Sequence, residues 1–262
     1  MSLTKEQFLE SVGVQAFEAG MFSIFFGVPG IGKTAMILWL AKRFKVLYIP
    51  FEGEDSASLL ANKGICPEVN QLPVMKNLHD FIEAIDAICE LDLDIDYVVI
   101  DTLTSLGVLY KADILANLFG GDVLKYGHYG KGNKACELHA DKIVDKFLQL
   151  KNKGINVILL AHSQNAKEEN AEGLDFAKQT FLCEPALRDQ IAAKADNIFR
   201  IGVDIFVDDS KGKGKASSTN QRVLYTENTA TSGCKNRIGC LPRYALGSNA
   251  ETGGEVIAEL LS

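Results

Sequence analysis

Gly27-Val28-Pro29-Gly30-Ile31-Gly32-Lys33-Thr34 is the stretch that decides the fold of this chain. Its glycines and its Lys-Thr pair match the spacing G-x-x-x-x-G-K-[ST] of a phosphate-binding loop. Residues 22–26 before it predict a buried strand, and residues 35–44 after it predict a helix. In that context the glycines let successive backbone N–H groups point inward at a phosphate. The sequence therefore predicts a nucleotide site at the junction of a strand and a helix.

The last two residues of the loop have individual roles in this prediction. Lys33 is expected to reach the β- and γ-phosphates of a nucleotide, and the Thr34 hydroxyl is expected to hold Mg²⁺. The first turn of the following helix adds unpaired N–H groups and partial positive charge. ATP and Mg²⁺ are therefore the expected cofactors. The expected nucleotide-binding residues are Gly27, Val28, Pro29, Gly30, Ile31, Gly32, Lys33, Thr34 and Ala35.

The composition is that of a globular protein whose surface as a whole does not attract polyanions. Of the 262 residues, 47% are hydrophobic and 23% are charged, and the formal net charge is −7. We expect one α/β domain, with a short helix over residues 1–20 and a core over about residues 21–245. The six cysteines form no C-x-x-C pair and are expected to be free thiols. Without a signal-peptide pattern or an apolar run of ~18 residues, we expect a cytoplasmic protein with no membrane contact.

Strand and helix patterns alternate along most of the chain. Such alternation is typical of an α/β fold with a mostly parallel central sheet and helices on both faces. Toward the C-terminus, residues 198–203 and 223–225 predict a β-hairpin that extends the sheet, and residues 208–218 between them predict a flexible loop. The other predicted strands cover residues 22–26, 46–49, about 72–75, 97–100 and 155–160, and the other predicted helices cover residues 78–91 and 136–150.

Acidic residues follow two of the predicted strands. Asp101 ends an apolar strand and has the form of a Walker B aspartate, which helps to hold Mg²⁺. The next residue is Thr102, so a carboxylate that activates water must come from another strand end. Glu52 and Glu54 lie just past the strand over residues 46–49, at the edge where ligands bind in open α/β sheets. We take Glu52 as the first candidate for this role and Glu54 as the second; the alternative is that both are solvated loop acids.

A third strand end places polar side chains at the same edge. His162 follows the strand over residues 155–160, with Gln164 behind it. A polar side chain at this position can touch the γ-phosphate and report its loss to the following loop. The alternative is a structural histidine that satisfies its hydrogen bonds within the protein.

The chain resembles the RecA-like P-loop ATPases over about residues 22–243. The resemblance rests on the phosphate-binding loop and on residues 48–53, 98–101 and 158–163. Within that superfamily it looks most like compact phage and prophage nucleotide-binding proteins related to RecA-type single-strand annealing recombinases. The resemblance implies an ATPase that acts on single-stranded DNA in phage-type recombination, annealing or replication. It also implies phage replication or recombination proteins as partners.

Lys235-Asn236-Arg237-Ile238-Gly239 is similar to the Lys-x-Arg element of hexameric RecA-like helicases and their relatives. There the two cations enter the nucleotide site of the neighbouring subunit, where a guanidinium can meet the γ-phosphate oxygens. The resemblance therefore implies catalytic roles for Lys235 and Arg237 in a homo-oligomeric ring or filament. The alternative is an ordinary surface lysine and arginine. The chain departs from the pattern in having His162 where RecA has glutamine, and in showing no N-terminal domain of the kind that many recombinases carry.

RecA-like proteins bind DNA with segments that follow the central strands, and three segments of this chain are candidates. Residues 110–134 mix cations, aromatic residues and glycine, which suits backbone contact combined with base stacking. Residues 165–184 are rich in acids and are a poorer candidate, and Lys211, Lys213 and Lys215 form a third patch. For each segment the alternative is a solvated mobile loop. The expected DNA-binding residues are Lys125, Tyr126, Tyr129, Lys131 and Lys134.

Two other functions fit the same motifs. A hexameric DNA helicase motor would use the same ATPase core, but the sequence shows no added loader-binding or primase-binding domain. An ATP-dependent switch that recruits a protein partner without binding DNA is mildly favoured by the net charge of −7. The rate of ATP hydrolysis with and without single-stranded DNA separates these functions.

Overall fold

A computed structural model describes residues 19–168, 173, 175–208 and 215–262. The helix expected over residues 1–20 lies almost wholly outside the described residues, as do Lys211 and Lys213 of the third candidate DNA segment.

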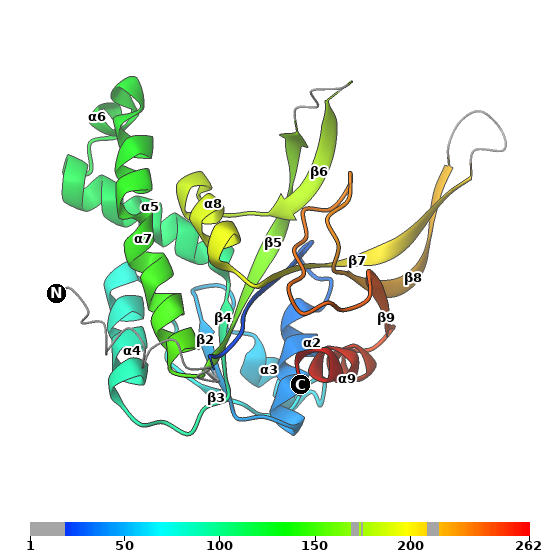
Figure 1. The fold of residues 1–262 in the computed structure, drawn as a ribbon. Coiled ribbons are helices and arrows are strands. Elements are labelled where there is room, and N and C mark those ends of the chain that lie inside the picture. The colour runs from blue at the N-terminus through cyan, green and yellow to red at the C-terminus, as the bar shows by residue number, and fades with distance from the viewer. Residues whose placement is uncertain (1–18, 169–172, 174, 209–214) are drawn as a thin grey trace, which may run out of the picture.

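Nine strands in the described part of the chain form one sheet, in the order β3-β2-β4-β5-β1-β7-β8-β9, with β6 paired to β5 (Figure 1). The central strands β2, β4, β5, β1 and β7 are parallel, whereas β6, β8 and β9 are antiparallel to their neighbours. The expected α/β fold with a mostly parallel sheet and a C-terminal hairpin extension is confirmed. The strands are β1 (Phe22–Gly27), β2 (Val46–Pro50), β3 (Asn70–Gln71), β4 (Tyr97–Asp101), β5 (Asn156–Glu168), β6 (Phe176–Phe181), β7 (Asn197–Asp208), β8 (Lys215–Tyr225) and β9 (Arg243–Gly247).

Helices cover both faces of the sheet, as expected from the near-continuous apolar runs of its central strands (Figure 1). On one face α4, α5, α7 and α8 enclose a core that includes Phe81, Phe147 and Leu187. On the other face α2 and α9 enclose a core that includes Met36 and Ile257. No helix in the described ranges is long and apolar enough to cross a membrane. The helices are α2 (Lys33–Leu38), η1 (Trp39–Lys42), α3 (Ala57–Asn62), α4 (Leu78–Glu90), α5 (Leu103–Phe119), α6 (Val123–Gly127), η2 (His128–Gly130), α7 (Lys131–Asn152), α8 (Pro185–Lys194) and α9 (Ala250–Leu261).

Strands β5, β7 and β8 and helix α7 are longer than predicted, and two short predicted elements also differ from the structure. The helix expected over residues 35–44 is α2, which begins at Lys33 and tightens into the 3₁₀ turn η1. The strand expected near residues 72–75 is the two-residue β3, and Met75 contributes only a bridge to Phe51. Both differences concern the ends of short elements, where tertiary packing decides the boundary.

The first candidate DNA segment, residues 110–134, is helical and not a loop. Its first part belongs to α5, which buries Leu106, Tyr110 and Ile114 against the core. The rest forms α6, η2 and the start of α7, which project from the body of the molecule (Figure 1). Residues 165–184, expected to be a second loop, form most of the antiparallel β5–β6 hairpin. Lys167 and Lys178 of that hairpin pair with Asp175 and Glu168, so its lysines are neutralised locally.

The core continues past residue 245, where the sequence placed its end. Helix α9 buries Ile257, Ala258 and Leu261 in the same cluster as α2. Gly253 and Gly254 permit this contact, because a Cβ on Gly254 would lie 2.2 Å from Cβ of Trp39. Either glycine replaced by a larger residue would force α9 away from α2.

Candidate nucleotide-binding site

The phosphate-binding loop follows β1 at the carboxyl edge of the sheet. Gly30 and Gly32 have positive φ angles of 77° and 96°, a region that L side chains rarely adopt. Gly27 is needed for a different reason, since a Cβ there would lie 2.4 Å from the carbonyl oxygen of Ile201. The loop borders a hollow that is also lined by Glu54, Asp101 and His162. His162 lies within β5, which continues to Glu168, and not after the end of its strand as expected.

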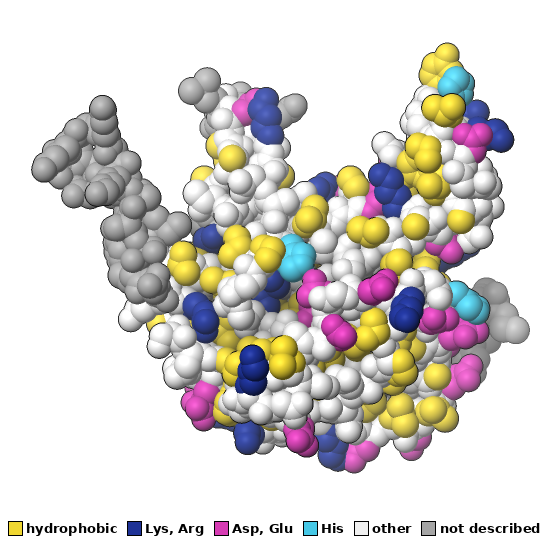
Figure 2. All heavy atoms as spheres, turned by 180° about the vertical axis from the view of Figure 1, so that it is seen from behind, with side chains coloured by type: hydrophobic (Ala, Val, Ile, Leu, Met, Phe, Trp, Pro, Cys, Tyr) yellow, Lys and Arg dark blue, Asp and Glu magenta, His cyan; other side chains and the backbone are white. Residues whose placement is uncertain are grey.

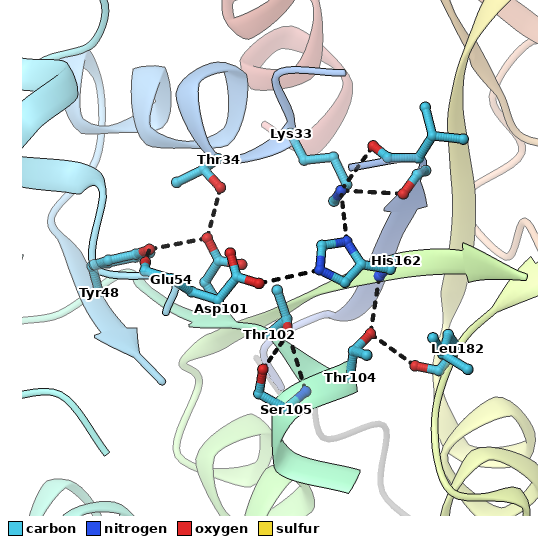
Figure 3. Close-up of polar contacts among 12 residues, drawn as sticks. Lys33, Thr34, Tyr48, Glu54, Asp101, Thr102, Thr104, Ser105, His162 and Leu182 are labelled. Atoms are coloured by element: carbon cyan, nitrogen blue, oxygen red, sulfur yellow. Dashed lines mark hydrogen bonds and ion pairs between the residues drawn. The ribbon is translucent and has the colours of Figure 1, made fainter. Parts of the chain in front are cut away.

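Lys33 points into this hollow (Figure 3). Its Nζ donates to the carbonyl oxygens of Gly27 at 3.1 Å and Val28 at 3.3 Å, and lies 3.5 Å from Nδ1 of His162. Burial lowers the pKa of Lys33, while Asp101 and Glu54 oppose that shift. The loop's own carbonyl groups therefore hold an ammonium group that an incoming phosphate can attract.

Asp101 is the most buried carboxylate of the site, with a relative exposure of 1%. The Thr34 hydroxyl donates to its Oδ2 at 2.6 Å, and the Tyr48 hydroxyl lies 2.9 Å from the same atom. Burial raises the pKa of Asp101 to about 6, against the lowering effect of the Thr34 hydrogen bond. The second oxygen, Oδ1, is buried and has no hydrogen-bond partner among the residues that the structure describes.

This donor set fits Mg²⁺. Thr34 and Asp101 offer oxygen ligands, which a hard cation prefers, and the orphaned Oδ1 of Asp101 lacks a donor that a Mg²⁺-bound water would supply. In the described part of the chain no group of three His, Cys, Asp or Glu side chains could hold a metal without help. Mg²⁺ at this site would therefore depend on phosphate oxygens, as is usual for nucleotide sites.

The structure brings Glu54, and not Glu52, to the phosphate-binding loop (Figure 3). Oε1 of Glu54 lies 3.1 Å from Nε2 of His162, and both side chains are about three-quarters buried. Glu52 is exposed and borders a separate hollow beside Met75. The turn at Gly53, with a φ of 87°, separates the two acids, and the Tyr48 hydroxyl holds the carbonyl of Glu54 at 2.6 Å. The order of preference drawn from the sequence is therefore reversed.

The backbone of His162 is fixed from two directions. Its N–H donates to the Thr104 hydroxyl at 3.0 Å, which itself donates to the carbonyl of Leu182 at 2.9 Å. Its carbonyl accepts from the N–H of Leu182 at 2.7 Å. His162 thus connects the nucleotide hollow to the chain just past β6. Gln164 does not take part, because its amide donates to the carbonyl of Phe181 within the β5–β6 hairpin.

Tyr48 and Thr104 are site residues that the sequence analysis missed. Tyr48 is a fully buried residue of an apolar strand, and its hydroxyl reaches Asp101 on the neighbouring strand β4. The available signal was a phenol one residue before the end of the apolar strand predicted over residues 46–49. Thr104 carried no such signal, because its role depends on contact with segments more than 50 residues away.

Lys235 and Arg237 lie at the amino ends of the parallel strands β1 and β7, opposite the carboxyl edge that carries the phosphate-binding loop. Lys235 donates to the carbonyl oxygens of Ala192 and Ala193, both at 3.0 Å, and so caps the last turn of α8. Arg237 lies 3.5 Å from Asp196, which precedes β7 and bonds to the start of β1. The six residues of β1 separate this edge from the phosphate-binding loop by roughly 17–20 Å, so Arg237 cannot reach the nucleotide hollow of its own subunit.

The five expected DNA-binding residues differ in their exposure and in their contacts with neighbouring side chains. Tyr126 is half-buried, with its ring 5.4 Å from that of Phe119, so it supports the α6 projection instead of offering a free face. Lys125 and Lys134 form ion pairs with Asp122 and Glu137. Tyr129 is 91% exposed, and Lys131 is exposed with no ion pair in the described part of the chain.

The tip of this projection is apolar as well as cationic. Val123 and Leu124 are exposed by 67% and 86%, and Figure 2 shows hydrophobic side chains gathered at the end of the projection. An exposed apolar group of this kind usually marks an interaction site.

A family model described as an AAA domain matches residues 20–238, most of the chain. No curated protein is similar enough to count as a match. Among solved structures, the crystal structure of flagellar accessory protein FlaH from Methanocaldococcus jannaschii resembles this chain with a TM-score of 0.44 and 13% sequence identity. The similar region covers 94% of this chain and 92% of that chain.

Proposed function

This chain belongs to the AAA-domain family of P-loop proteins, and from that premise we propose that it binds ATP with Mg²⁺ and hydrolyses it to ADP and phosphate. One observation carries the proposal: five polar side chains from four separate segments converge on the hollow beside the phosphate-binding loop (Figure 3). They are Lys33, Thr34, Glu54, Asp101 and His162.

Each of these residues has a chemical task in the proposed reaction. Lys33 exchanges its backbone carbonyl partners for phosphate oxygens and stabilises their developing charge. Glu54 orients the attacking water and accepts its proton, while His162 fixes the Glu54 carboxylate. Thr34 and Asp101 would hold Mg²⁺, which neutralises phosphate charge when bound.

Glu54→Gln is expected to preserve nucleotide binding and to lower kcat by about 10²–10⁴-fold, because the amide keeps the shape of the carboxylate but cannot accept the proton. Glu52→Gln is the matched control, since Glu52 lies outside the hollow. Steady-state ATPase assays and calorimetric titration with ADP measure the two effects. If Glu52→Gln lost turnover and Glu54→Gln kept it, the assignment of the base would be wrong.

We further propose that the protein acts in a homo-oligomer on single-stranded DNA, with the α6 projection in contact with the strand. Support comes from the exposed ring of Tyr129 and from Lys131, two residues later, which is exposed and has no ion pair with any described residue. Aromatic rings stack on bases of any sequence, and an unpaired cation can replace counterions on phosphate. Recombination, annealing or replication in a phage setting, with phage proteins as partners, belongs to the same proposal.

Tyr129→Ala is expected to weaken single-stranded DNA binding, since one stacked base contributes roughly 1–3 kcal/mol. Lys131→Ala is expected to reduce the salt slope by about 0.7, whereas Lys134→Ala is expected to change it less because Lys134 is already paired. Anisotropy titrations of a labelled oligonucleotide, at several salt concentrations and with a non-hydrolysable ATP analogue, measure both.

The same titration, together with an unwinding assay on forked DNA, separates the alternatives. Absence of binding at low salt would favour a switch that recruits a protein through the apolar tip at Val123 and Leu124. Binding accompanied by strand separation on forked DNA would favour a helicase motor.

A further inference from the structure

Arg222 of β8 lies against the phosphate-binding loop. A Cβ built on Gly32 would lie 3.5 Å from Cζ of Arg222, and 3.6 Å and 3.7 Å from its two terminal nitrogens. The guanidinium therefore covers the residue that precedes Lys33, although the two segments are distant in sequence. No motif of the sequence indicated this contact.

Within the described ranges the guanidinium of Arg222 has no hydrogen bond or ion pair, although the side chain is half-buried. The arginines of the two neighbouring strands are bonded: Arg200 of β7 to Gln179 at 2.8 Å, and Arg243 of β9 to Asp204 at 3.0 Å. A partly buried cation without a counter-ion carries a desolvation cost, which an anionic ligand would offset.

The backbone around Arg222 is irregular on both sides. Arg222 is opposite Val203 in β7 and Gly247 in β9, and the register of both ladders shifts next to it. Such bulges re-aim side chains and are frequent beside active sites. Here they accompany a side chain whose guanidinium lies against the loop.

We propose that Arg222 binds the α- and β-phosphates of the nucleotide held by its own subunit. This inference rests on the proposed binding of ATP. The phosphate chain is the anion that the loop is built to hold, and a guanidinium can meet two of its oxygens at once. Arg222 would act beside Lys33 as a second cation, contributed by the C-terminal part of the sheet.

The position of Arg222 in the sheet is the reason for assigning it to the α- and β-phosphates and not to the γ-phosphate. Asp101 and His162, which mark the γ-phosphate end, come from β4 and from β5 on one side of β1. Arg222 comes from β8, on the other side of β1. It therefore approaches the loop from the side away from the γ-phosphate, and its contact is expected in ADP as well as in ATP.

Arg222→Ala is expected to weaken the binding of Mg-ADP and of a non-hydrolysable Mg-ATP analogue by a similar factor of about 10–100, the range for a hydrogen bond to a charged group. Arg222→Lys is expected to restore part of the affinity as a point charge. Arg243→Ala is the matched control, since Arg243 is in the neighbouring strand, is exposed and pairs with Asp204. Calorimetric titration measures binding, and thermal unfolding without nucleotide checks that each variant is folded.

Each result separates this inference from the proposed function. Wild-type protein that binds neither nucleotide would overturn both. Wild-type protein that binds, with folded Arg222→Ala equally tight, would overturn the role of Arg222 alone. A loss confined to the ATP analogue would place Arg222 at the γ-phosphate and overturn the assignment to the α- and β-phosphates.

Discussion

Replacing Lys33 with alanine is expected to reduce ATP hydrolysis to the rate of a blank without protein. Lys33 is 6% exposed, and its ammonium group lies between the loop carbonyls and His162, where a phosphate would bind. In such a water-poor site a fixed cation stabilises developing phosphate charge far more than it would in water. Nucleotide binding is expected to weaken in the same variant, because Lys33 contacts the phosphates before the reaction as well as during it.

The fold is expected to survive this substitution. Burial lowers the pKa of Lys33, so folding carries a cost for its charge, and removal of the amine relieves that cost. Lys42→Ala is the matched control: Lys42 follows the same helix, but its Nζ lies 5.6 Å from the Trp39 ring centre and away from the hollow. ATPase assays and thermal unfolding test both statements. A folded Lys33→Ala protein with turnover near that of Lys42→Ala would contradict the nucleotide site.

The phosphate-binding loop and the Walker B strand were predictable because their signals are local. Gly30 and Gly32 have positive φ angles, which glycine adopts readily, so the glycines of the motif indicate this backbone conformation directly. Asp101 followed from the apolar strand before it. The choice between Glu52 and Glu54 was not predictable, because the turn at Gly53 and a contact across to His162 decide which acid faces the loop.

The helical projection could not be predicted from composition. Residues 110–134 mix cations, aromatic residues and glycine, which suggested a DNA-binding segment, with a solvated mobile loop as the alternative. Gly132, however, lies against the Tyr126 ring, where a Cβ would approach to 2.4 Å, so this glycine serves close packing. The position of Arg222 could not be predicted from the sequence either. Its contact with Gly32 depends on the pairing of β7, β8 and β9 and not on the residues next to it in the chain.

Arg237→Ala is expected to bind ATP almost normally and to lose about 10³–10⁵-fold in hydrolysis, the range for an arginine supplied by a neighbouring subunit. Arg237 is too far from its own phosphate-binding loop to act there, and its side chain is 56% exposed. Loss of the contact between Arg237 and Asp196 would disturb the fold little, because Asp196 keeps its shorter contact to Lys151 at 2.6 Å. Lys235 is tied to the end of α8, so Arg237 is the residue of the pair that is free to enter a neighbouring site.

Mixing the Arg237→Ala and Lys33→Ala proteins tests whether Arg237 acts across a subunit boundary. The Lys33→Ala subunits keep an intact Arg237, and the Arg237→Ala subunits keep an intact nucleotide site. In a ring or filament some intact sites then face intact arginines, so the mixture is expected to regain activity that neither protein has alone. Arg222→Ala mixed with Lys33→Ala is expected to gain nothing, because Arg222 serves the site of its own subunit. If light scattering and exchange of labelled subunits show mixed assemblies that stay inactive, Arg237 does not act between subunits.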